Sequence, residues 1–257
     1  AIMTMSTTAF AAENPAEVFD RVMEKNNTIQ SAEIQSGVHS VILAKDVIPD
    51  GQMKVDMAMH AEMDMQDTTD LKYLAQVASS ILGQDSYSQV FYTDGYYYVD
   101  ANGVKLKYPM PLEQIISSVQ TGVNTSNMES SYMKGISLNE VNGKRVLAYE
   151  ANPKKLNKNV KEALGTVMNT LGTDVNLDMN IQEMKGAYVL DDNDYIIYMT
   201  NYIVYNMEVL DQPMTCITLM ETEVQNPGEP VVVTLPSTDG YEDLIGLYDG
   251  VIESEVE

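Results

Sequence analysis

The sequence predicts an α+β protein in which one large antiparallel sheet carries helices packed on one face. Three observations support this fold class. Apolar and polar residues alternate without a break through residues 52–66. Several strand-like segments are joined by Asp-Gly or Asn-Gly, the dipeptides that tight β-hairpins favour. The helical segments do not alternate regularly with strands, so a parallel sheet built from βαβ units is not expected.

The segment 52–66 has the clearest period in the chain. Every second position is apolar, namely Met53, Val55, Met57, Met59, Ala61, Met63 and Met65. A helix would scatter these positions around its circumference, whereas a strand places all of them on one face. At about 3.3 Å per residue the strand would extend over more than about 40 Å. We expect its apolar face to meet a core and its polar face to meet water.

Further strands are predicted from alternating or β-branched runs bounded by turn residues. They are 29–44, 87–92, 96–99, 104–108, 132–141, 144–150, 175–190, 195–209, 214–224 and 231–235. After Glu183 the apolar positions change parity, which indicates a β-bulge within the strand 175–190. The acidic run 191–194 is predicted to be a turn.

Four helices are predicted from apolar residues three and four positions apart. They are 15–26, 68–82, 111–120 and 152–172. In the first, Asn14 provides a cap, Pro15 suits the first helical position and Glu17 completes a capping box. In the second, Leu71, Leu74 and Ile81 follow helical spacing, and Gly83 is expected to end the helix.

Composition and charge exclude several classes of partner. The chain has 38 acidic and 15 basic residues, which gives a net charge of −23. This field repels phosphate, so neither nucleic acid nor an anionic membrane surface is an expected partner. Cys216 is the one cysteine, so no intramolecular disulfide can form. No stretch approaches the roughly 20 apolar residues of a transmembrane segment.

The amino terminus indicates export. Residues 1–11 end in the small-x-small sequence Ala9-Phe10-Ala11, which resembles a signal-peptidase site. We interpret residues 1–11 as the tail of a signal peptide, and a flexible apolar N-terminal tail is the alternative. Residues 12–257 are then expected to form a single domain with an acidic C-terminal tail. The protein would be bacterial and located outside the cell or at its envelope.

The sequence offers no recognisable motif for catalysis or metal binding. The chain has no Gly-x-Ser-x-Gly, phosphate loop or dinucleotide fingerprint. His39 and His60 lie on separate predicted strands, which makes a zinc site a poor interpretation. The acidic run 191–194 has calcium-type oxygens but lacks the spacing of an EF-hand. We therefore predict no catalytic residue, no metal and no cofactor, and we expect that the protein is not an enzyme.

The methionine-rich face is the remaining functional signal. Methionine is unbranched and polarisable, so it adapts to irregular apolar surfaces and to varied ligands. The predicted ligand-binding residues are Met53, Val55, Met57, Met59, Met63, Met65, Leu177, Met179 and Ile181. The alternative is that these side chains only fill an ordinary core between sheet and helices.

Three sequence features together resemble a known family. They are the helix sequence PAEVFDRVMEK at 15–25, the Met-x-Met strand, and the meander FYTDGYYYVD at 91–100 followed by KLKYPM at 105–110. Over residues 14–236 they resemble uncharacterised exported or lipoprotein families similar to LolA/LppX-like carriers. The resemblance implies a strongly curved, unclosed half-barrel whose concave face is covered by helices, with lipid or acyl chains in an apolar cavity between them. The lipobox cysteine common in such lipoproteins is absent from the N-terminus.

Two functional hypotheses follow. The first is an exported, non-catalytic carrier or binding protein, acting as a monomer, for an apolar ligand such as a lipid or an acyl chain. The second is a structural or protein-interaction module at the cell surface with a cell-envelope protein as its partner. Tyr92 and the run Tyr96–Tyr98 favour the second, because tyrosines are effective interface anchors.

Overall fold

The structure, a computed structural model, describes residues 13–45, 48–67, 69–111, 128–158, 179–209 and 212–244. Within these ranges a single sheet of 12 strands has the order β12-β6-β5-β4-β3-β2-β1-β11-β10-β9-β8-β7. Neighbouring strands are antiparallel except for the short parallel pair β12 and β6. Two meanders, β1 to β6 and β7 to β11, therefore meet in the middle of the sheet, where β1 pairs with β11.

The strands are β1 (Ser31–Leu43), β2 (Gln52–Asp64), β3 (Lys72–Ile81), β4 (Gln84–Thr93), β5 (Tyr96–Ala101), β6 (Val104–Pro109), β7 (Met133–Val141), β8 (Lys144–Ala151), β9 (Met179–Leu190), β10 (Ile196–Val209), β11 (Gln212–Gln225) and β12 (Glu242–Asp243). The described helices are α1 (Pro15–Asn26) and the short 3-10 turns η1 (Pro49–Gly51) and η2 (Ser130–Tyr132). Residues 153–158 are also helical.

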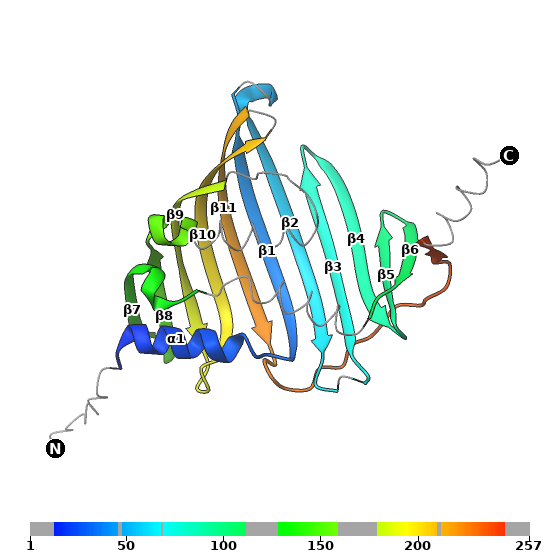
Figure 1. The fold of residues 1–257 in the computed structure, drawn as a ribbon, viewed down its shortest axis with the longest axis horizontal. Helices are drawn as coiled ribbons and strands as arrows, with labels where there is room; N and C mark the ends of the chain where they lie inside the picture. The colour runs from blue at the N-terminus through cyan, green and yellow to red at the C-terminus, as the bar shows by residue number, and fades with distance from the viewer. Residues whose placement is uncertain are drawn as a thin grey trace, which may run out of the picture.

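The sheet is broad, curved and unclosed. Figure 1 shows β7 at one side of the molecule and β6 at the other, with no contact between them. Helix α1 lies across the strand ends at the β7 side, and it packs against β7 and η2. Apart from η1, which joins β1 to β2, the described helical structure lies at the β7 side of the sheet.

The predicted fold class, an α+β protein with helices packed on the concave face, is wrong. The described chain is mostly sheet, and α1 is a small element beside 12 strands. Of the four predicted helices, 15–26 is confirmed and 68–82 is a strand. The predicted helix 111–120 and most of 152–172 lie outside the described residues, as do residues 1–11, residues 175–178 of the predicted strand and the acidic tail from 245.

The segment predicted as the helix 68–82 forms β3 because it has strand partners on both sides. Residues 72–81 pair with β2 and residues 73–81 pair with β4, so both ladders satisfy the backbone groups of this strand. The helical spacing of Leu71, Leu74 and Ile81 is coincidental, since strand propensity depends on such neighbours. Gly83 does not end a helix. Leu82 and Gly83, with φ of 52° and 76°, form the two-residue turn into β4.

Local signals elsewhere predict the structure correctly. Asn14 caps α1, because its Oδ1 accepts a hydrogen bond of 3.1 Å from the Ala16 N–H. Both residues of each predicted hairpin turn have positive φ, at Asp94-Gly95, Asn102-Gly103 and Asn142-Gly143. The bulge predicted near Glu183 is confirmed. Val204 pairs with Glu183 and the next residue pairs with Ile181, which leaves one extra residue in β9.

The predicted strand 231–235 is wrong, because these residues pair with no described strand. They instead cover the face of the sheet opposite to α1. Val233 packs there with the residues of a small aromatic core. That core contains Phe91 and Tyr98, whose rings stack with centroids 4.6 Å apart, and Tyr241, which meets both rings edge-on. The larger cores lie on the other face, beneath α1 and beside it.

Candidate functional site

A pocket with a volume of about 730 Å³ lies on the α1 side of the sheet. Its described lining contains no Asp, Glu, Lys, Arg or His. Eight methionines and four tyrosines contribute, together with smaller apolar residues. These twelve are Met23, Met59, Met63, Met110, Met128, Met184, Met199, Met220, Tyr73, Tyr97, Tyr108 and Tyr188. The lining is therefore apolar, deformable and uncharged.

Strand register explains why residues far apart in sequence share this pocket. Ala32 on β1 pairs with Met63 on β2, and Ile34 lies between Ala61 of β2 and Val224 of β11. Paired residues of neighbouring strands point to the same face of the sheet. The pocket-lining side chains of β1, β2 and β11 are therefore followed by further lining side chains on β10 and β9. The pocket thus spans both meanders across the β1–β11 junction, and α1 contributes to its edge.

Two of the nine predicted ligand-binding residues, Met59 and Met63, line this pocket, together with Ala61 from the same strand face. Met65 is buried just beyond the end of β2, in the core that also contains Met63. Val55 and Met57 lie on the same face nearer the other end of β2, and Met57 is 38% exposed. Ligand binding by any of these residues stays a prediction.

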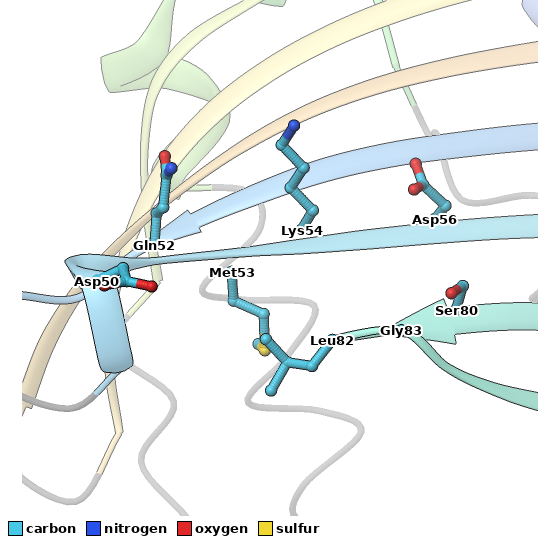
Figure 2. A pocket seen from close by; sticks show the side chains of 8 residues that line it. All are labelled: Asp50, Gln52, Met53, Lys54, Asp56, Ser80, Leu82 and Gly83. Atoms are coloured by element: carbon cyan, nitrogen blue, oxygen red, sulfur yellow. The ribbon is translucent and has the colours of Figure 1, made fainter.

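The other predicted residues lie elsewhere. Ile181 is buried in the core beneath α1, Met179 is half-buried at the start of β9, and Leu177 lies outside the described residues. Met53 lines a separate shallow depression of about 300 Å³ near η1. Figure 2 shows Met53 pointing toward Leu82 while Lys54 and its alternate neighbours point to the other side of β2. The depression also has charged walls, so the pocket on the α1 side is the better candidate.

Sequence reasoning missed most of the lining. Met184, Met199 and Met220 each occupy predicted strands, and they carry the same chemical signal as Met59. Tyr97 was assigned to a protein interface, but it lines the pocket and burial raises its pKa to about 12. The methionine content alone could have suggested these residues. The sequence does not show which strands are neighbours in the sheet, so it could not bring these residues together.

The tyrosines that favoured an interaction surface are used for packing on both faces of the sheet. Tyr92 is buried beside the pocket in the core that contains Met63. Tyr98 is buried on the opposite face against Phe91. Tyr96 is half-buried, and the Lys107 ammonium lies 5.3 Å from its ring centroid. These side chains therefore do not form one exposed patch.

A few polar groups interrupt the apolar floor. Asn201 and Thr222 are each 5% exposed and line the pocket together with Ser36. The Ser36 and Thr222 hydroxyls are 2.8 Å apart and share a hydrogen bond. Asn201 Oδ1 accepts a hydrogen bond from the Tyr149 hydroxyl. Burial raises the pKa of Tyr149 far above its ordinary value, so this hydroxyl is protonated and donates.

Comparison with known proteins assigns the family. The sequence matches the model of DUF6612, a family of unknown function, over residues 14–236. The chain belongs to the DUF6612 family. No curated protein matches it. Within its described part, the DUF6612 chain has no helix with the length and apolar character needed to cross a membrane, and no three His, Cys, Asp or Glu residues are grouped as metal ligands would be.

Several solved structures are similar to the DUF6612 chain at low identity. LprF from Mycobacterium bovis is 10% identical with a TM-score of 0.36, and the match covers 88% of this chain and 99% of that chain. The ywiB protein from Bacillus subtilis is 11% identical with a TM-score of 0.24, covering 77% and 96%. A beta-barrel-like DUF1849 protein from Brucella abortus is 11% identical with a TM-score of 0.25, covering 76% and 98%. At these TM-scores the likenesses carry no argument about the ligand.

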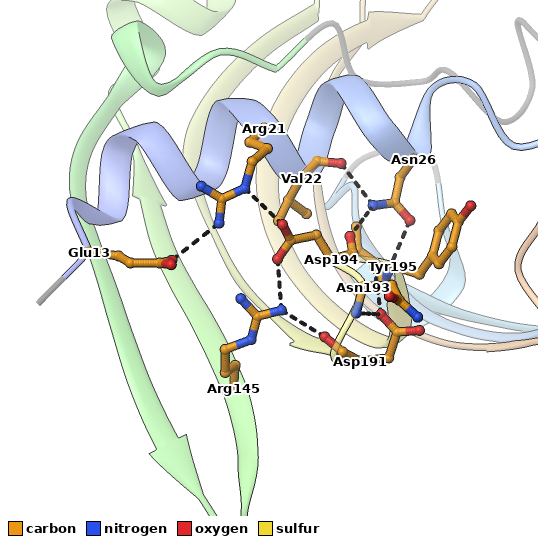
Figure 3. A network of polar contacts seen from close by, with 10 residues as sticks. Glu13, Arg21, Val22, Asn26, Arg145, Asp191, Asn193, Asp194 and Tyr195 are labelled. Carbon is orange, nitrogen blue, oxygen red and sulfur yellow. Dashed lines mark hydrogen bonds and ion pairs between the residues drawn. The ribbon is translucent and has the colours of Figure 1, made fainter. Parts of the chain in front are cut away.

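Helix α1 of the DUF6612 chain is held against the sheet by two arginines that share one carboxylate (Figure 3). Arg21 Nε of α1 and Arg145 Nη2 of β8 each lie 2.7 Å from an oxygen of Asp194, in the turn between β9 and β10. Asn26, at the end of the helix, donates to the Asp194 carbonyl and accepts from the Ile196 N–H. These contacts fix the helix that forms one edge of the pocket.

The carboxyl of Asp194 depends on this pairing. Burial favours its neutral form, but the hydrogen bonds from Arg21 and Arg145 outweigh burial and lower its pKa below the ordinary 3.8. A carboxyl whose pKa is lowered by folding contributes stability above its ordinary pKa. This contribution is lost as the pH falls through the lowered value.

We expect Asp194→Asn to lower the free energy of unfolding by about 1–2 kcal/mol near neutral pH, because two charge-assisted hydrogen bonds are weakened and one arginine is half exposed. Asparagine tolerates the φ of 66° at this position, so the change isolates the charge. Urea unfolding at a series of pH values measures the effect. The difference from wild type should vanish at low pH, where Asp194 is protonated.

The matched control is Asp192→Asn, in the same turn but exposed. This variant should differ from wild type by less than about 0.5 kcal/mol at every pH. Equal effects of the two substitutions would show that the arginine pair does not stabilise the attachment of α1.

Proposed function

We propose that this protein is an exported, non-catalytic carrier or binding protein for an apolar ligand, a lipid or an acyl chain, held in the pocket on the α1 side of the sheet. One observation carries the proposal, namely an uncharged cavity of about 730 Å³ lined largely by methionine and tyrosine. This volume falls within the range of roughly 300–1,000 Å³ of ligand sites, which are also mostly apolar.

The chemistry of the lining supports a flexible aliphatic ligand. Methionine side chains rearrange at low cost, so one cavity can accept chains of different shape. Each methylene group buried there contributes about 0.8 kcal/mol. A chain of about ten methylenes therefore gains about 8 kcal/mol before the cost of immobilising it, which is enough for stable binding.

The remaining parts of the proposal rest on the sequence. Residues 1–11 support export, because they end in a small-x-small site. The missing hydrolase, phosphate-loop and dinucleotide motifs support a role without catalysis. The family resemblance to LolA/LppX-like carriers supports the same role, and the unclosed sheet agrees with it.

Native mass spectrometry of the purified protein, before and after extraction with organic solvent, tests the proposal. We expect co-purified lipid, and we expect the extracted protein to bind a fluorescent fatty acid with a single stoichiometric site. A protein that carries no lipid and does not bind the probe after extraction would contradict it.

Ala61→Phe is expected to weaken binding of that probe by about tenfold. Ala61 lines the pocket and is 7% exposed, so a phenyl ring there occupies space that ligand would fill. Excluding about two methylenes costs about 1.6 kcal/mol, which corresponds to about tenfold in affinity. Fluorescence titration measures the change.

Ala58→Phe is the matched control. Ala58 is three residues away on the opposite, exposed face of β2, so its substitution should leave affinity unchanged. If both variants bind the probe as wild type does, the ligand does not occupy the pocket.

A further inference from the structure

Three uncharged polar side chains lie in the floor of the apolar pocket. Ser36 on β1 pairs with Thr222 on β11, and Asn201 on β10 pairs with Met220, two residues before Thr222 on β11. All three line the pocket. Ser36 and Thr222 satisfy each other through their hydrogen bond of 2.8 Å. Asn201 is different, because no described residue accepts a hydrogen bond from its amide NH₂.

The Asn201 amide group is held with its NH₂ toward the cavity. The side chain is 95% buried, and its Oδ1 accepts from the Tyr149 hydroxyl. No side chain or backbone group in the described ranges accepts a hydrogen bond from Nδ2, and Nδ2 is not enclosed by protein. An aliphatic ligand that covers this donor without offering an acceptor displaces the water that can hydrogen-bond to it, which is unfavourable. A group in the pocket that accepts this hydrogen bond would remove this penalty.

The surroundings of Asn201 keep this orientation. The Tyr149 hydroxyl donates to the amide oxygen, so the NH₂ of Asn201 faces away from Tyr149. Gly186 on β9 pairs with both Asn201 and Tyr149. A Cβ at this position would lie 2.6 Å from Asn201 Oδ1 and 2.8 Å from the Tyr149 oxygen. The close approach of the amide and the phenol therefore requires glycine on the strand between them.

The type of acceptor follows from the charge of the lining. A carboxylate or phosphate moved to this floor would lose its hydration and would meet no cation among the described lining residues, which is strongly unfavourable. An ester or amide carbonyl is uncharged, its oxygen can accept a hydrogen bond from one donor, and its carbon is bonded to the aliphatic chain. Such a carbonyl fits a single amide donor in an otherwise apolar cavity.

We infer that the pocket binds lipids through an ester or amide linkage, whose carbonyl oxygen accepts a hydrogen bond from Asn201 Nδ2. This inference rests on the proposed carrier function and specifies the class of ligand. It places the linkage at the junction of β10 and β11, with the aliphatic chain extending along the methionine-lined face toward Met59 and Met63.

The test compares two lipids that differ in one carbonyl alone, 1-oleoylglycerol and its ether analogue 1-O-oleylglycerol. Competition against a fluorescent fatty acid gives both affinities for the delipidated protein. We expect the ester to bind about fivefold more tightly, the ratio that one neutral hydrogen bond provides. In Asn201→Leu, which keeps the size but removes the donor, the two lipids should bind equally.

Asn206→Leu is the control, since Asn206 lies on the same strand but is exposed and outside the pocket lining. It should keep the ester preference. Equal binding of the two lipids by wild type, or a preference that survives in Asn201→Leu, overturns this inference and leaves the carrier function standing. Failure of both lipids and of the probe to bind overturns both. The wild-type comparison decides the matter even if Asn201→Leu does not fold.

Discussion

Phe19→Ala is expected to lower the free energy of unfolding by about 4 kcal/mol. Phe19 is fully buried on the inner side of α1. Its ring meets Tyr149 edge-on at 5.7 Å between centroids and lies 6.2 Å from Tyr188. Removing it leaves a cavity between the helix and the sheet and deletes two aromatic contacts. Urea unfolding followed by circular dichroism measures the loss.

The same substitution should also weaken binding of a fluorescent fatty acid, because α1 positions Met23, Asn26 and Asn27 at the edge of the pocket. Glu24→Ala is the matched control on the exposed side of this helix, and it should change stability by less than about 0.5 kcal/mol. If Phe19→Ala and Glu24→Ala had the same free energy of unfolding, the apolar face of α1 would not anchor the helix to the sheet.

Gly186→Ala is expected to lower the free energy of unfolding by about 2–3 kcal/mol, the range for overpacking a closely packed site. A Cβ there would lie 2.5 Å from the Thr200 carbonyl oxygen, in addition to its clashes with Asn201 and Tyr149. A backbone carbonyl within a sheet ladder has little freedom to move. The added methyl group must therefore separate β9 from β10 or displace the Tyr149–Asn201 pair.

Gly135→Ala provides the control for intrinsic effects of alanine in a strand. Gly135 lies in β7, and nothing lies within 4 Å of the position its Cβ would take, so this variant should be as stable as wild type or slightly more so. Thermal unfolding of the pair isolates the steric effect. Gly186→Ala should also reduce the preference for ester over ether lipids. Equal stability of the two variants would show that β9 accommodates the methyl group.

The parts of the fold that could be predicted depend on residues close together in sequence. The alternation of apolar and polar residues predicted the strand β2, and Asn14 predicted the start of α1. Both predictions depend on local geometry, and both are confirmed. The helix predicted over residues 68–82 is wrong, because the structure of this segment depends on residues that are not close in sequence. Its spacing at Leu71, Leu74 and Ile81 suits a helix, and only the two flanking strands make it β3. Strand pairing is tertiary information, so it overrode the local pattern.

The candidate site shows the same limit. The period of β2 correctly grouped Met53, Met57, Met59 and Met63 on one face, but it cannot say which part of that face is covered. Of these four residues, only Met59 and Met63 line the pocket on the α1 side. The donor at Asn201 could not be recognised, because its importance depends on Tyr149 and on a glycine from a third strand.

The pairing of β1 with β11 has a consequence for how the protein reaches its final form. The two strands join halves of the chain that are distant in sequence, since Ser36 and Thr222 are separated by 186 residues. Contacts of such long range are slow to form, because the entropy of closing the intervening loop must be overcome first. Each meander contains only part of the methionine surface. The complete cavity therefore exists only once β1 and β11 have paired, and a ligand that spans both meanders would favour that pairing.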